Sequence, residues 1–95
     1  MSGEIQKKRP ALIVSNDASN KYLNRVQVVP LTSQLERVYP SEAEVTLNGR
    51  PNKAMADQLT TVSKMRLTKL AGRLANSDMK RVEHAIRIQL GLSRA

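Results

Sequence analysis

The stretch EAEVTL, residues 42–47, carries the clearest strand pattern in this 95-residue chain. Polar and apolar residues alternate along it, so the apolar side chains share one face of an extended strand. Asn48-Gly49 follows directly, and this dipeptide is a strong signal for a hairpin turn. Pro51 lies just beyond it, so we expect a connection longer than two residues. The stretch predicts one strand of a small sheet with a turn behind it.

The residues before this stretch predict two further strands. Residues 11–15 form an apolar run, typical of a strand that is buried on both faces, and residues 16–20, NDASN, have the composition of a loop. Residues 26–30 alternate in a second strand, and Pro30 should end its pairing or place it at an edge of the sheet. The polar residues 33–41 predict a loop.

The residues after the hairpin signal complete the sheet and add a helix. Strands are expected at residues 53–58 and 69–75, with an irregular segment at residues 60–67 between them. Ser77 has the side chain of a helix N-cap, and Gly91 is typical of a helix end. One stripe at helical spacing is apolar, formed by Met79, Val82, Ala85, Ile86 and Leu90. The opposite stripe carries Lys80, His84 and Arg87.

These elements predict one domain over residues 1–95, mainly β with one C-terminal helix. Asp78, in the first turn of that helix, should complement the positive end of the helix dipole. The chain lacks Phe and Trp, and Tyr22 and Tyr39 are its only aromatic residues. A core this small gains from a dimer interface that supplies the missing burial.

The composition favours a polyanionic partner. Sixteen Lys and Arg residues against eight Asp and Glu residues give a net charge of +8. Such a field attracts nucleic acid and speeds the encounter with it. The alternative is a basic surface that has no polyanionic partner.

Several kinds of site are excluded by residues that the chain lacks. Without cysteine there is no disulfide, thiol nucleophile or thiolate zinc site, and the single His84 excludes a metal site built on a histidine pair. His84 is expected to be a solvated helix residue. No apolar run approaches the ~18 residues of a membrane span, and no signal-peptide core follows Met1, so we expect a cytoplasmic protein without membrane association.

The carboxylates offer weak candidates for a metal site. Glu42 and Glu44 stand two apart on a strand and project from the same face, so they could hold a divalent metal. A solvated face that limits edge pairing is the favoured interpretation. Asp57 could serve a site or satisfy a turn, and the sequence leaves these alternatives even. We expect no metal and no cofactor.

A more specific group of residues lies where the first two predicted strands begin and end. In EIQKKRP, residues 4–10, a carboxylate and three cations precede a proline. Pro10 has no N–H and is tolerated at the start of a strand, so Arg9 should lie on the rim of the sheet, where it can face a phosphate. The second strand runs into PLTSQ, residues 30–34, whose hydroxyls also suit a phosphate. Two such strands could bring Arg9 and Thr32 to one rim.

Together these segments resemble a known family. EIQKKRPALIVSND at residues 4–17, VVPLTS at residues 28–33, ADQ at residues 56–58 and LGL at residues 90–92 are similar to the MazF/PemK toxins, the ribosome-independent mRNA interferases of toxin–antitoxin pairs. The resemblance extends from about residue 3 to residue 92. The Arg-Pro and Thr-Ser pairs together are its most specific part.

The resemblance implies an SH3-like small barrel of mostly antiparallel strands that works as a homodimer, with RNA across the dimer groove. It also implies that Arg9 and Thr32 are the catalytic pair and that Glu4 is the general base of a metal-independent endoribonuclease. Contacts to RNA are expected from Lys7, Lys8, Ser33 and Gln34. The implied partners are single-stranded RNA and a cognate acidic antitoxin similar to MazE.

One difference from the family pattern and two other functions remain open from the sequence. Family members usually carry a strand and a loop before the segment that matches Glu4 to Arg9, and the printed sequence begins after them. Either the start is truncated or misassigned, or the chain is a naturally shortened homologue, and in the second case a barrel edge lies open. The chain could be a non-catalytic basic module that binds nucleic acid or antitoxin, or a gyrase inhibitor similar to CcdB, which shares the fold. The presence of both Arg9 and Thr32 favours the enzyme.

Overall fold

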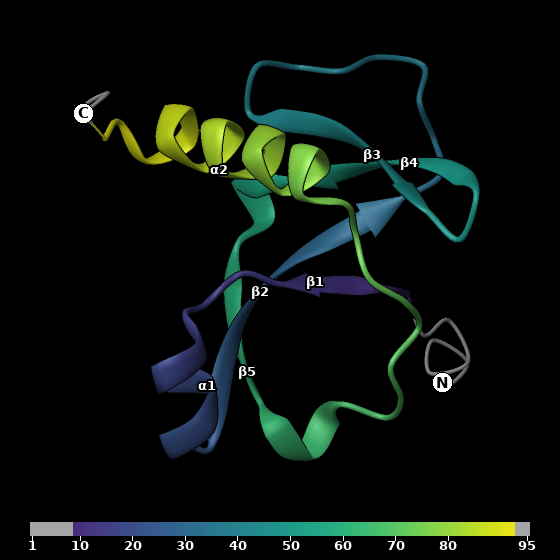
Figure 1. The fold of residues 1–95 in the computed structure, drawn as a ribbon. Helices are drawn as coiled ribbons and strands as arrows, with labels where there is room; N and C mark the ends of the chain where they lie inside the picture. The colour runs from purple at the N-terminus through teal and green to yellow at the C-terminus, as the bar shows by residue number, and fades with distance from the viewer. Residues whose placement is uncertain (1–8, 93–95) are drawn as a thin grey trace, which may run out of the picture.

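A curled sheet of five strands carries the fold, and one long helix packs across one end of it (Figure 1). The computed structural model describes residues 9–92. The elements along the chain are β1 (Ala11–Ile13), α1 (Asp17–Tyr22), β2 (Arg25–Thr32), β3 (Glu42–Leu47), β4 (Arg50–Met55), the 3₁₀ turn η2 (Ala56–Gln58), β5 (Thr60–Ser63), the 3₁₀ turn η3 (Lys64–Arg66) and α2 (Asn76–Leu90). Strand pairing within the described residues is antiparallel, in the order β1-β2-β4-β3 with β5 also on β2. The predicted mainly β architecture with a C-terminal helix is confirmed, and the sheet forms a half-barrel.

The long strand β2 lies at the centre of the sheet and changes partner along its length. Its residues 25–28 pair with β5, whereas Leu31 and Thr32 pair with β4. On the other edge of β2, Ala11 of β1 lies opposite Pro30. Pro30 falls between the segments that pair with β5 and β4, where its missing N–H leaves no ladder bond unmade. The proline therefore does not end the strand, which continues to Thr32.

The β3–β4 hairpin closes through a two-residue turn. Asn48 and Gly49 have φ angles of 52° and 77°, the left-handed values that a tight hairpin turn requires at both central positions. All six residues of β3 pair with β4 across this turn, so the bounds predicted for this strand are confirmed. The expected longer connection before Pro51 is wrong. Pairing of β4 with β2 involves only Lys53 and Ala54, so Pro51 lies where β4 has β3 alone beside it.

Two predictions between the hairpin and the helix are wrong. Residues 60–63 form β5, inside the segment that was expected to be irregular, and residues 69–75 form neither strand nor helix. Pairing with β2 stabilises β5. Residues 69–75 instead run as a strap toward α2, held where the Asn48 side-chain amide donates a hydrogen bond to the Ala71 carbonyl at 2.8 Å. Gly72 passes so close that an added Cβ would lie 2.7 Å from the Asn48 Oδ1 atom.

Helical turns occupy two other segments where different structure was expected. Residues 16–20 enter α1 instead of forming a loop, because the Asn16 side chain accepts a hydrogen bond from the Ser19 N–H at 2.8 Å and caps the helix. The composition that suggests a loop is also the composition of helix N-caps. The strand expected at residues 53–58 is β4 as far as Met55 and then becomes η2.

Helix α2 begins earlier than expected and ends where expected. Its first hydrogen bond joins the Met79 N–H to the Ala75 carbonyl at 3.0 Å, so Ala75 is the N-cap and Ser77 lies inside the first turn. Gly91 ends the helix in the left-handed conformation, with φ of 68°. The predicted apolar face is buried at Val82 and Ala85, half-buried at Met79 and Ile86, and exposed at Leu90. The opposite stripe, Lys80, His84 and Arg87, is exposed as predicted.

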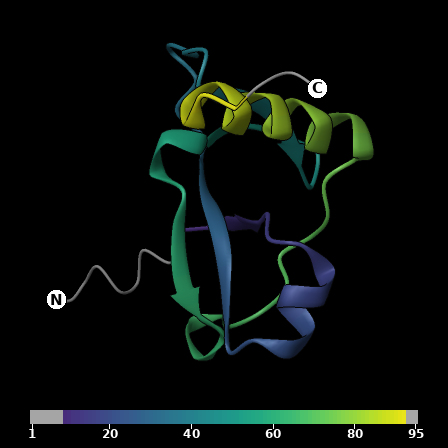
Figure 2. The ribbon, with the colours of Figure 1, turned by 90° about the vertical axis from the view of Figure 1, so that its left-hand side faces the viewer.

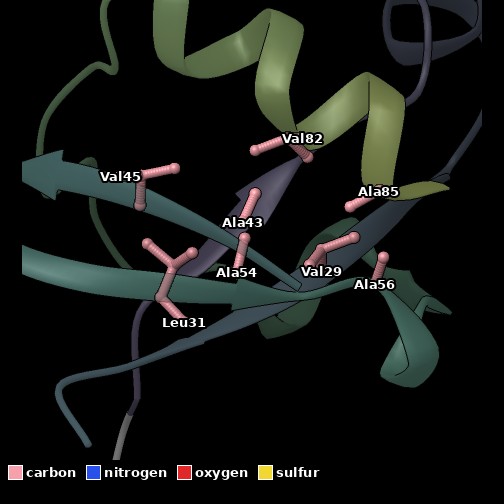
Figure 3. Close-up of a cluster of buried hydrophobic side chains, with 8 residues drawn as sticks. All are labelled: Val29, Leu31, Ala43, Val45, Ala54, Ala56, Val82 and Ala85. Carbon is pink, nitrogen blue, oxygen red and sulfur yellow. The ribbon is translucent and has the colours of Figure 1, made fainter. Parts of the chain in front are cut away.

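The core lies between α2 and one face of the sheet (Figure 3). Its buried members are Val29, Leu31, Ala43, Val45, Ala54, Ala56, Val82 and Ala85. Burying a valine or leucine side chain contributes about 1.5 to 3 kcal/mol, and the alanines allow the helix to approach the strands closely. Figure 2 shows α2 across one end of the molecule, with β2 and β5 running side by side away from it. Leu31 faces this core, so Thr32, one residue later, faces the other side of the sheet.

Within residues 9–92, α2 and α1 are each too short or too polar to cross a lipid bilayer.

Candidate active site

The register of β1 against β2 aligns the two predicted catalytic residues. Ala11 lies opposite Pro30, and one residue earlier the Leu31 N–H donates a hydrogen bond to the Pro10 carbonyl at 3.1 Å. Continuing this antiparallel register by one residue puts Arg9 opposite Thr32. Residues that face each other in this way project from the same side of the sheet. The two residues therefore share one rim of the sheet, on the side away from the core.

Both residues leave hydrogen-bonding capacity for a ligand. Arg9 is exposed, and its guanidinium has no hydrogen-bond or ion-pair partner among residues 9–92. Thr32 is half-buried, and its Oγ1 atom accepts a hydrogen bond from the Gln34 N–H at 3.2 Å. Because that oxygen is occupied as an acceptor, its own proton can be donated elsewhere. The rim thus offers one charged and one neutral donor.

The remaining predicted site residues fall into two groups. Ser33 and Gln34 follow Thr32 directly in the chain and are exposed, and the Gln34 N–H bonds to Thr32. Glu4, Lys7 and Lys8 lie outside the residues that the structure describes.

Sequence reasoning missed Lys53, which lies directly opposite Thr32 on β4. Its side chain is only 11% exposed, and its Nζ atom donates hydrogen bonds to the Arg37 carbonyl at 2.5 Å and to Glu42 Oε1 at 3.0 Å. A buried ammonium is stable only when such partners replace water. Had the two-residue turn at Asn48-Gly49 been predicted, its register would have placed this lysine opposite Glu44, as the structure does.

Glu42 is an ion-paired residue rather than part of a solvated face, which corrects the favoured interpretation of this position. Its side chain is 10% exposed, and Oε1 accepts hydrogen bonds from Lys53 and from the Tyr39 N–H at 3.0 Å. Burial raises the pKa of the carboxyl, but the Tyr39 N–H and the Lys53 ammonium outweigh this effect and hold the pKa below its ordinary value. Glu44 is exposed, as expected.

The other candidates lie away from this rim. Within residues 9–92, no three His, Cys, Asp or Glu side chains gather as metal ligands would. Asp57 is exposed, in the middle of η2. His84 lines an open depression of about 490 Å³ between β3 and α2, together with Glu44 and Lys80.

Comparison with known proteins identifies the family. The sequence model of one family, described as PemK-like, MazF-like toxin of type II toxin-antitoxin system, matches residues 2–90. Endoribonuclease MazF9 of Mycobacterium tuberculosis is 32% identical over 98 residues, covering 94% of this chain and 83% of the relative. Endoribonuclease MazF of Staphylococcus saprophyticus is 32% identical over 89 residues, covering 88% of this chain and 74% of the relative.

Solved structures agree with this relationship. A mycobacterial endoribonuclease in complex with its cognate antitoxin is similar with a TM-score of 0.82 at 28% identity, over 92% of this chain and 84% of that one. Toxin MazF-mt6 of M. tuberculosis is similar with a TM-score of 0.80 at 25% identity, over 90% and 89%. On the family match and the shared fold, this chain belongs to the family of PemK-like, MazF-like toxins of type II toxin–antitoxin systems.

Proposed function

We propose that this chain is a toxin endoribonuclease that cleaves single-stranded mRNA without a metal ion. The observation that carries the proposal is the antiparallel register that aligns Arg9 with Thr32 on one rim. The endoribonuclease names of its relatives support the same activity. The net charge of +8 favours a polyanionic substrate.

The RNA supplies its own nucleophile in this mechanism. The 2′-oxygen forms a bond to phosphorus while the bond to the 5′-oxygen breaks, so the products are a 2′,3′-cyclic phosphate and a 5′-hydroxyl. The enzyme must take the proton of the 2′-hydroxyl and stabilise the negative charge that builds on the phosphate oxygens.

Arg9 and Thr32 have the donors for this charge. The Arg9 guanidinium is permanently charged and its planar fork can meet two phosphate oxygens at once. The Thr32 hydroxyl can add one hydrogen bond, since the Gln34 N–H already occupies its oxygen as an acceptor. Glu4 is our candidate for the base that accepts the 2′-hydroxyl proton, and the leaving 5′-oxygen takes up a proton in turn.

The remaining roles follow from charge and family. Lys7 and Lys8 would contact backbone phosphates, and Ser33 and Gln34 would hold the RNA beside the reacting group. A homodimer would supply a continuous groove for the strand. A cognate acidic antitoxin would compete for this basic surface, and its binding to the folded toxin alone would raise the melting temperature. We place the activity in the cytoplasm, where mRNA is found.

The test is cleavage of a long mixed-sequence RNA in EDTA by the wild type, Arg9→Ala and Arg25→Ala. We expect the wild type to cleave and Arg9→Ala to be slower by about 100- to 1000-fold, the loss typical of one transition-state donor. Its affinity for 2′-O-methyl RNA, which lacks the nucleophile, should fall far less. Arg25 is a matched control, because it is an exposed arginine at the other end of β2.

Three results would overturn parts of this proposal. RNA that stays intact with wild type under all conditions would leave the binding-module function in its place. Strict dependence on added magnesium would reject the metal-independent mechanism. Equal losses of binding and cleavage in Arg9→Ala would make Arg9 a positioning residue.

A further inference from the structure

The loop between β2 and β3, residues 33–41, presents an aromatic ring and a guanidinium together. In Figure 1 it arches from the end of β2 to the start of β3. Tyr39 is 50% exposed, Arg37 is exposed, and the Arg37 Nη1 atom lies 3.4 Å from the Tyr39 hydroxyl. Tyr39 is one of only two aromatic residues in the chain. The ring does not belong to the core cluster or to the partly buried residues packed against it.

Three hydrogen bonds hold the backbone that carries this pair. The Lys53 Nζ atom donates to the Arg37 carbonyl at 2.5 Å. The Tyr39 N–H donates to Glu42 Oε1 at 3.0 Å, and the Glu42 N–H donates to the Tyr39 carbonyl at 2.8 Å. Lys53 and Glu42 are themselves paired and nearly buried. The backbone of the loop is therefore fixed before any ligand arrives, while the two functional side chains stay accessible.

The same lysine relates the loop to the candidate catalytic rim. Lys53 lies opposite Thr32 in the sheet, so their side chains project from the same face. The Arg37 carbonyl lies within the reach of that one lysine side chain. The backbone that carries the ring and the guanidinium is thus anchored to a lysine that shares its face of the sheet with Thr32, where the scissile phosphate would be held.

We propose that Tyr39, assisted by Arg37, is a stacking subsite for one nucleobase of single-stranded RNA next to the cleaved phosphate. The inference rests on the proposed ribonuclease function and deepens it. Exposed aromatic rings bind unpaired bases by stacking, and arginine adds attraction to a base or to a neighbouring phosphate. A duplex would hide its base faces, so the subsite also selects single strands.

Tyr22 provides a matched control. It is 76% exposed on α1, and the Lys21 Nζ atom lies 5.3 Å from its ring centre, so it too is an exposed tyrosine beside a cation. It precedes β2, whereas Tyr39 follows that strand; the eight residues of β2 span roughly 25 Å in extended form. Loss of a general basic or aromatic surface would affect both tyrosines, but loss of this subsite affects Tyr39 alone.

Tyrosine fluorescence separates the two rings, because the chain has no tryptophan. Tyr22→Phe leaves Tyr39 as the only tyrosine, and Tyr39→Phe leaves Tyr22. We expect a random-sequence pool of 2′-O-methyl RNA 12-mers to quench the first variant and not the second, after correction for absorption by the RNA. Equal quenching of the two variants, or none in either, would overturn the subsite.

Binding and cleavage by the variants complete the test. Tyr39→Ala should bind the same 2′-O-methyl pool at least about tenfold more weakly, the size of one lost base stack. Tyr39→Phe, which keeps the ring, should bind as the wild type does, and so should Tyr22→Ala. Unchanged binding by Tyr39→Ala would reject the subsite and would assign the exposed ring to a contact with a protein partner instead.

The outcomes distinguish this inference from the function on which it rests. If wild type cleaves RNA and Tyr39→Ala cleaves subsaturating RNA equally fast, the subsite fails and the ribonuclease stands. If Tyr39 is quenched by RNA but wild type cleaves no RNA, the subsite stands and the ribonuclease fails.

Discussion

Glu42 and Asp78 each accept a hydrogen bond from a backbone N–H and form an ion pair with a cation, but they hold different parts of the molecule. Glu42 binds the Tyr39 N–H and pairs with Lys53, whose side chain is 11% exposed. Asp78 binds the Thr46 N–H at 2.9 Å and pairs with Arg81 at 2.6 Å, and the Arg81 side chain is 58% exposed. The first carboxylate fixes the β2–β3 loop beside the candidate site. The second fixes α2 to β3.

The difference between these regions separates function from stability. Asp78 is not a member of the hydrophobic core cluster, but its bond to the Thr46 N–H fixes α2 to β3. Because α2 contributes Val82 and Ala85 to that cluster, the position of the helix decides how well the core packs. The Glu42–Lys53 pair instead holds the polar backbone of the β2–β3 loop, through the Tyr39 N–H and the Arg37 carbonyl. We expect damage to either region to lower the free energy of unfolding, and damage to the first region to change activity as well.

The largest effect should come from Lys53→Met. It leaves the nearly buried Glu42 carboxylate without a cation, and removing one member of such a pair costs about 2 to 3 kcal/mol here, somewhat less than for a fully buried pair. Urea unfolding at one protein concentration, followed by circular dichroism, measures this loss. The double variant Glu42→Gln/Lys53→Met should recover part of it, because no unpaired charge remains. A double variant that is less stable than Lys53→Met would contradict a cost that arises from the stranded carboxylate.

Asp78→Ala should have the next largest effect. It removes the acceptor of the Thr46 N–H and one anchor of α2, which costs about 1 to 3 kcal/mol. Asp78→Asn keeps a side-chain oxygen and should retain most of the stability, because an ion pair with a cation as exposed as Arg81 contributes less than about 1 kcal/mol. The cleavage rate of the folded protein should stay unchanged in both variants. If the Asn and Ala variants unfold alike, the charge of Asp78 and not its hydrogen bond would be the anchor.

The smallest effect concerns pH. The pKa of Glu42 is lower in the folded protein than its ordinary value of 4.5, so its ionised form stabilises the fold. This contribution is fully present above pH 4.5 and disappears as the pH falls through the lower folded value. The difference in unfolding free energy between wild type and Glu42→Gln should therefore be constant near neutrality and shrink in acid. A difference that grows as the pH falls would show that the pKa of Glu42 is raised.

The sequence predicts those elements whose pattern is local. The alternation at residues 42–47 defines β3 to the residue, and Gly91 marks the end of α2. Residues 60–63 are exposed or half-buried and lack an apolar alternation, and they become a strand only because β2 lies beside them. The strap at residues 69–75 has strand-like apolar residues but no strand to pair with. The presence or absence of a partner strand distant in sequence therefore decides that residues 60–63 form a strand and residues 69–75 do not.

The candidate site follows the same rule. Arg9 and Thr32 could be singled out from their residue types and from the family resemblance, and the register of β1 on β2 aligns them. Lys53 carries no motif, and its importance appears only when β4 lies between β2 and β3. The partner of Glu42 was missed for the same reason. Residues recognised by pattern lie at the rim, whereas the residues that hold them in place depend on the three-dimensional pairing.

The two-residue turn of the β3–β4 hairpin also has a consequence for the order of folding. Closing six residue pairs over Asn48 and Gly49 costs little chain entropy, since the paired residues are close in sequence. Hairpins of this kind form in about 1 to 10 μs. The pairing of β2 with β5 joins residues up to 38 apart, from Arg25 to Ser63, and must wait for a longer loop to close. We infer that the hairpin is the first part of the sheet to persist and that α2 docks on it, so the rim that carries Thr32 is completed late.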